Sequence, residues 1–118
     1  DGAASQRDSS VKNQIKYISP FDVNSKEEKV SKFVNSYKAK YNALPDQFAA
    51  DAYDAVYAVF NAMKKTGVNT VTVDPTALGT AMAKAITASD FSYDGLTGKM
   101  TWEASGACNK VPVIVELG

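Results

Sequence analysis

The segment from Phe48 to Phe60 places apolar residues at intervals of three and four along an alanine-rich run. That spacing is the period of an α-helix, so the pattern predicts a helix over about 46–66 that ends at Gly67. Alanine is a strong helix former, and the apolar surface of this segment is wider than a single stripe. We therefore expect this helix to be largely buried.

Two further helices are predicted, one on each side of the first. One covers about 26–42, where Ser25 and Glu28 stand three positions apart. This spacing predicts a capping box, in which each of the two residues satisfies a free amide at the start of a helix. The other helix is expected to begin with Asp74 as N-cap and Pro75 as its first residue.

Three short strands are expected, at 14–21, 99–103 and 111–117. The last of them is the strongest prediction, because Val111, Val113 and Val115 alternate along it. The β-branched run 68–73 is typical of a strand, or of an extended connection leading into the next helix. The glycine-containing stretches 93–95 and 97–98 are expected to form turns.

The composition indicates one soluble globular domain. The chain has 118 residues, of which 45% are hydrophobic and 22% are charged. Its 13 basic residues balance its 13 acidic ones, which gives no electrostatic reason to expect a nucleic acid as partner. A net charge of zero also removes a guard against self-association. No apolar run is long enough for a membrane-spanning helix.

The residues on which most catalysis depends are scarce. The chain has no histidine, the commonest general base and metal ligand. Cys108 is the single cysteine, and we expect it to be an ordinary loop thiol. Asp51 and Asp54, three residues apart on one predicted helix, could form an acid–base pair or bind a metal, but a structural or solvated role is favoured. We therefore expect no enzyme, no cofactor and no metal site.

The order of features along the chain points to a known family. The features are Pro20-Phe21, the charged helix ending at Tyr41 and Pro45, the Phe48-Ala-Ala-Asp-Ala-Tyr-Asp-Ala-Val-Tyr helix, the short helix after Pro75, Phe91…Gly95-Leu-Thr-Gly98, and Trp102-Glu103…Gly106. This order resembles the C-terminal third of type I periplasmic binding proteins. Among these it is most similar to the branched-chain amino-acid (Leu/Ile/Val) receptors of ABC importers. The resemblance covers about 12–118.

The resemblance implies an α/β fold of about three helices packed on short strands, forming part of a lobe. Residues 1–118 are then a single fragment. In such proteins two lobes are joined by crossing strands and close on the ligand by hinge motion. The resemblance assigns 12–21 to a hinge-crossing strand, 25–90 to the helical portion of the N-terminal lobe, and 95–118 to crossing and C-terminal-lobe strands.

The resemblance also implies a ligand site at the start of the second helix. Phe48 corresponds to a position that lines the cleft and covers an apolar ligand side chain. A phenylalanine at the start of a helix can equally be a packing staple. Asp51, one turn further on, is a weaker candidate for a polar contact at the rim of the cleft.

The expected function is that of an extracytoplasmic solute-binding module of an ABC transporter. Its partners in the full-length protein would be an amino acid or similar small ligand and the ABC permease. The rest of the receptor is absent from these 118 residues, so we expect the fragment alone to bind amino acids negligibly. Two alternatives are a ligand-sensing domain of a signalling receptor with the same fold, and a small α/β interaction protein with no transport role.

An isolated lobe fragment must also hide the apolar face that the rest of the receptor would cover. We therefore expect self-association into a homodimer or a domain-swapped pair. The strands at 111–117 or 14–18 are expected to pair across chains.

Overall fold

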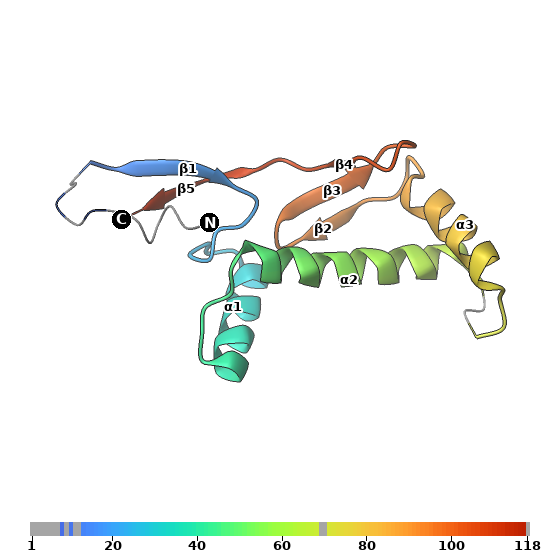
Figure 1. Ribbon diagram of the computed structural model, residues 1–118, viewed down its shortest axis with the longest axis horizontal. Coiled ribbons are helices and arrows are strands. Elements are labelled where there is room, and N and C mark those ends of the chain that lie inside the picture. The colour runs from blue at the N-terminus through green and yellow to red at the C-terminus, as the bar shows by residue number, and fades with distance from the viewer. Residues whose placement is uncertain (1–7, 9, 11–12, 69–70, 118) are drawn as a thin grey trace.

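The computed structural model describes residues 8, 10, 13–68 and 71–117 of the chain. Within this part the chain forms the helices α1 (Glu28–Tyr41), α2 (Gln47–Thr66) and α3 (Pro75–Ile86), and the strands β1 (Ile15–Ser19), β2 (Tyr93–Gly95), β3 (Gly98–Trp102), β4 (Cys108–Asn109) and β5 (Val113–Leu117). Figure 1 shows α2 running along the long axis of the molecule, with α1 near its N-terminal end and α3 near its C-terminal end. The molecule measures 60 × 31 × 23 Å.

The strands form two separate antiparallel sheets, which confirms the mixed α/β fold with three helices and short strands. One sheet is a two-stranded ribbon of β1 and β5, in register from Ile15 opposite Leu117 to Ser19 opposite Val113. The other has the order β2-β3-β4 and runs alongside α2 (Figure 1). The ribbon buries Ser19 and Val115 on one face and exposes Ile18 and Ile114 on the other.

A small apolar core lies where α1, the start of α2 and the β2–β3 turn meet. Its buried members are Phe21, Val30, Ala50 and Leu96. The ring of Phe33 packs edge-on against Phe21, with 6.2 Å between their centroids. This core fixes the N-terminal end of α2 against the hairpin formed by β2 and β3 and against the end of β1.

The boundaries of α2 follow its sequence. Asp46 is the N-cap, and its carboxylate accepts a hydrogen bond of 2.8 Å from the amide of Ala49. Gly67 ends the helix in the left-handed conformation, with φ of 66°. That conformation is one that glycine adopts without the steric penalty of a Cβ.

The expectation that α2 is largely buried is wrong for this chain. Its buried residues are small or polar: Ala50, Asp54, Ala58 and Ala62. The larger residues on the other side are exposed, among them Val56, which is 67% exposed, Val59 and Phe60. The strands and α3 cover the alanine side, and the bulky side stays open in the described part of the chain.

The capping box predicted for α1 does not form. The N-cap is Glu27, and no side chain caps the helix. Ser25 lies two residues earlier, in a turn where its amide donates to the carbonyl of Asp22 at 3.1 Å. Its hydroxyl accepts instead from the amide of Glu27 at 3.3 Å, because the turn begins the helix later than the spacing suggested.

Three local predictions in the second half of the chain also need correction. Residues 93–95, expected as a turn, form β2, and the turn itself is Leu96–Thr97. Val71–Val73 lies in a turn and bend rather than in a strand, whereas 69 and 70 fall outside the described residues. Cys108, expected in a loop, pairs with Trp102 as part of β4 and remains exposed. No helix within the described ranges is long and apolar enough to cross a membrane.

Candidate functional site

The two residues predicted to contact a ligand lie one turn apart near the start of α2. Phe48 is 62% exposed, so its ring is not held in the core of the chain. Asp51 is half-buried, and its Oδ1 lies 2.7 Å from Nζ of Lys110. The structure therefore presents an open aromatic ring beside a carboxylate that already has a cationic partner.

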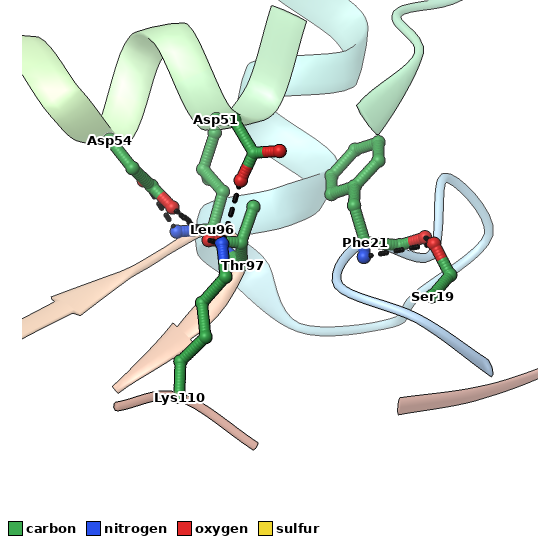
Figure 2. A network of polar contacts seen from close by, with 7 residues as sticks. All are labelled: Ser19, Phe21, Asp51, Asp54, Leu96, Thr97 and Lys110. Atoms are coloured by element: carbon green, nitrogen blue, oxygen red, sulfur yellow. Dashed lines mark hydrogen bonds and ion pairs between the residues drawn. The ribbon is translucent and has the colours of Figure 1, made fainter. Parts of the chain in front are cut away.

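Lys110 links Asp51 to the β2–β3 turn. Its Nζ also donates a hydrogen bond of 3.0 Å to Oγ1 of Thr97 (Figure 2). The residue lies between β4 and β5, far along the chain from α2. Sequence reasoning missed this lysine, because no local pattern relates it to a helix that ends more than forty residues earlier.

Asp54 joins α2 to the same turn. Its carboxylate, only 1% exposed, accepts hydrogen bonds from the amides of Leu96 and Thr97, both at 2.8 Å, and from the Thr97 hydroxyl at 2.7 Å. These donors replace the water that a buried carboxylate loses. The sequence favoured a structural or solvated role for Asp51 and Asp54, and for Asp54 the structure shows the structural one. Its partners in the turn were not predicted, because Leu96 lies 42 positions further along the chain and no local pattern relates the two segments.

Gly95 makes this close approach possible. A Cβ built on it would lie 2.5 Å from the carboxyl atoms of Asp54, which is closer than a Cβ atom comes to a heavy atom to which it is not bonded. Any larger residue would push the turn away from α2. The close packing of the turn on α2 therefore requires both residues, Gly95 for the space and Asp54 for the hydrogen bonds.

A cavity of about 360 Å³ lies on another side of the hairpin, between α1, α2 and β2. Its walls include Lys29, Lys32, Phe33, Tyr53 and Tyr93. Both lysines are already paired, Lys29 with Asp94 at 2.7 Å and Lys32 with Glu28 at 2.6 Å. Burial, together with the charge of Asp54, raises the pKa of Tyr93 to about 12, so its hydroxyl stays protonated above the pH at which a free tyrosine ionises. The cavity thus offers aromatic walls without an unpaired charge from these lysines.

The acidic and thiol groups do not gather into a metal site in the described ranges, where no cluster of three or more His, Cys, Asp or Glu residues is found. Asp51 and Asp54 bond to different partners on the two sides of Thr97 (Figure 2). Both carboxylates therefore serve to hold segments of the chain together.

The sequence model of a protein family described as the receptor family ligand binding region matches residues 7–117. The chain belongs to this family. Its fold is that of the type I periplasmic binding proteins, of which the chain forms part of a lobe. No curated protein matches the chain.

Solved structures with a similar fold are solute-binding proteins of ABC transporters. One, from Rhodopseudomonas palustris BisB5 in complex with 3,4-dihydroxybenzoic acid, is 20% identical with a TM-score of 0.69 over 85% of this chain and 25% of that one. A putative branched-chain amino acid ABC transporter from Rhodospirillum rubrum is 26% identical with a TM-score of 0.65, over 84% of this chain and 27% of that one.

A third, a substrate-binding protein from Desulfitobacterium hafniense in complex with Leu, is 19% identical with a TM-score of 0.64, over 89% of this chain and 28% of that one. The chain thus spans about a quarter of the length of these proteins. At such identities the likeness to the first and third shows the fold.

Proposed function

We propose that the chain is the C-terminal portion of the solute-binding module of an ABC transporter, for an amino acid or a similar small ligand with an apolar part. The observation that carries this proposal is the open ring of Phe48 on the first turn of a helix whose start is otherwise well anchored. An aromatic ring exposed at the start of an anchored helix can cover an apolar group of a ligand. The similarity to solute-binding proteins supports the same reading.

In this proposal the chain supplies one wall of a cleft. Phe48 covers the apolar part of the ligand, and Asp51 can turn its Oδ2 to the rim while Oδ1 accepts from Lys110. Residues 12–21 and 95–118 carry the hinge-crossing strands, and 25–90 the helices of the N-terminal lobe. The second wall belongs to a portion of the receptor outside these 118 residues. The full protein would act outside the cytoplasm and deliver its ligand to an ABC permease.

The first test measures whether the 118-residue chain binds leucine by itself. Calorimetric titration of leucine into the 118-residue chain should give no binding heat, because a single wall leaves the charged groups of the amino acid unpaired. Micromolar affinity for leucine would contradict the proposed division of the cleft.

The second test restores the missing wall. The chain would replace the corresponding part of the Desulfitobacterium hafniense protein, which was solved in complex with Leu, and leucine binding to the chimera would be measured by calorimetry. Phe48→Ala should weaken binding roughly ten-fold or more, because it removes an aromatic contact from the ligand. Tyr41→Ala, which alters an exposed ring on α1, should leave the affinity unchanged. Equal affinities of the Phe48→Ala chimera and its parent would exclude Phe48 as a ligand contact.

We also propose that the isolated chain self-associates. β1 and β5 pair with each other within one chain, which occupies one edge of each strand. The apolar side of α2, formed by Ala55, Val56, Val59, Phe60 and Met63, remains as an open hollow. That surface is the one we expect a second copy to cover.

A further inference from the structure

The chain crosses twice between its two structural parts. We call β1 and β5 the ribbon, and α1–α3 with β2–β4 the body. The first crossing, from Ser19 to Phe21, is anchored in the core, where Phe21 is buried. The Ser19 hydroxyl tightens it, donating to the carbonyl of Phe21 at 2.9 Å and accepting from its amide at 3.2 Å (Figure 2).

The second crossing, 110–112, has no such apolar anchor. Val111 is 80% exposed and Pro112 is also exposed. Lys110 is the half-buried residue of the three, and its ammonium group lies between α2 and the β2–β3 turn. Asn109, directly before it, is held in the sheet by its pairing with Thr101 of β3. Beyond that strand, the course of the crossing depends on the polar contacts of the Lys110 side chain.

The contacts of Lys110 include a hydroxyl whose orientation is fixed, that of Thr97. The Thr97 hydroxyl donates to Asp54 and accepts from Lys110, so its orientation is set from both sides. Asp51 holds the same ammonium group at 2.7 Å. Asp51, Lys110, Thr97 and Asp54 thus form a continuous chain of polar contacts from the surface to the buried carboxylate (Figure 2). Both aspartates lie on α2 and Thr97 lies in the turn that packs on it, so Lys110 of the crossing is held by the body.

We propose that Lys110 is a positioning residue that latches the second crossing to α2 and so fixes the direction in which the ribbon leaves the body. With one crossing anchored by Phe21 and the other by Lys110, the ribbon cannot rotate about either connection alone. Loss of the latch leaves a single anchored crossing, which then acts as a hinge. This role is independent of whether the chain binds a solute.

The test measures the ribbon's orientation directly. Spin labels would be placed at the exposed positions Ile114→Cys on β5 and Ala39→Cys on α1, in a Cys108→Ser background. Labelled protein would be diluted with unlabelled chain, so that only distances within one molecule are recorded by pulsed electron resonance. The parent should show one narrow distance, and Lys110→Met should lose it in favour of a broad distribution. Lys110→Arg, which keeps the charge, should restore the narrow distance.

A matched control is available at the other end of α2. Lys65 forms an ion pair of the same length, 2.7 Å, with Asp90, but does not touch the ribbon. Lys65→Met should therefore leave the distance unchanged, and circular dichroism should show that both variants keep their helices. An unaltered narrow distance in Lys110→Met would overturn the latch. Equal broadening in Lys65→Met would overturn it as well, because the effect would then follow from general loosening.

Discussion

Asp54 shows how one charged residue can belong in an otherwise apolar face. On its side of α2 the buried neighbours are alanines, which let the helix backbone come close to the β2–β3 turn. A short carboxylate then reaches the amides of Leu96 and Thr97 and the Thr97 hydroxyl. Charge-assisted hydrogen bonds of this kind are stronger than neutral ones and compensate for the lost hydration.

The first prediction concerns this carboxylate. Asp54→Asn should lower the free energy of unfolding by about 2–4 kcal/mol, because the amide NH₂ faces amide donors that it cannot accept from. Asp51→Asn removes the charge of a more exposed pair and should change it by less than about 1 kcal/mol. Urea unfolding followed by circular dichroism measures both. If both variants lose a similar amount of unfolding free energy, the burial of Asp54 does not add to its contribution to stability.

The second prediction compares two glycines. Gly95→Ala should destabilise the chain by at least about 2 kcal/mol, because the new Cβ meets the Asp54 carboxyl at 2.5 Å and must separate the turn from α2. Gly79, inside α3, has nothing within 4 Å of such a Cβ. Gly79→Ala should therefore stabilise the chain by about 0.5–1 kcal/mol through helix propensity. Thermal unfolding should give shifts of opposite sign.

The third prediction concerns the ionisation of Tyr93. Its pKa is raised from 10.0 to about 12, by burial and by the charge of Asp54. The folded state thus favours the neutral phenol, and this stabilisation is fully present below pH 10 and disappears as the pH rises towards 12. After allowance for solvent screening, the difference in unfolding free energy between the parent and Tyr93→Phe should shift by about 1–2 kcal/mol over that range. If the difference in unfolding free energy between the parent and Tyr93→Phe stays the same from pH 9 to 12, the pKa of Tyr93 is not raised in the folded state.

At the scale of elements, the three helices differ in how their starts are fixed. Asp46 and Asp74 cap α2 and α3, each accepting from backbone amides of the first turn. Of the two N-caps, that of Asp74 is the one predicted from the sequence. The start of α1 follows a turn at Asp22 and has no side-chain cap. The local pattern therefore identified the N-cap of α3, and it failed for α1, where a preceding turn moved the start of the helix.

The fourth prediction follows from this difference. Asp74 accepts from the amides of Thr76 and Ala77 at 2.9 and 3.1 Å, so Asp74→Ala should destabilise the chain by about 1 kcal/mol. Ser25→Ala removes only a 3.3 Å bond outside the helix and should have less than half that effect. Urea unfolding of the two variants side by side decides whether the spacing of Ser25 and Glu28 has any capping function.

The elements were predictable from the sequence where their signal is local. The period of α2, the N-cap of α3 and the alternation in β5 are each contained in a few neighbouring residues. The pairing of β1 with β5 joins the two ends of the chain, and the bond from Thr97 to Asp54 spans 43 positions. Such contacts depend on how elements pack, so the local pattern gave neither the latch residue Lys110 nor the partner of Asp54.

At the scale of the whole molecule, the chain is more open than its size suggests. A compact protein of 12.6 kDa exposes about 6,200 Å² and one of 118 residues has a radius of gyration of about 13.5 Å. This chain exposes 8228 Å² and has a radius of gyration of 17.7 Å. Part of the excess is the apolar side of α2, where Val56, Val59 and Phe60 are exposed.

The fifth prediction is that this open side drives self-association of the 118-residue chain. The hollow along Ala55, Val56, Val59, Phe60 and Met63 is lined by apolar residues alone, and the net charge of zero does not oppose contact between copies. Light scattering coupled to size exclusion should find a dimer at micromolar concentrations.

Val59→Lys should return the chain to a monomer, because dimerisation would then bury an unpaired ammonium group on each helix. Val111→Lys makes the same substitution at an exposed valine outside the hollow and should leave the dimer intact. A parent that stays monomeric at high concentration would show that the hollow does not bind a second copy. A dimer broken by Ile114→Lys on the ribbon but not by Val59→Lys would place the contact on the strands instead, as the pattern of the sequence first suggested.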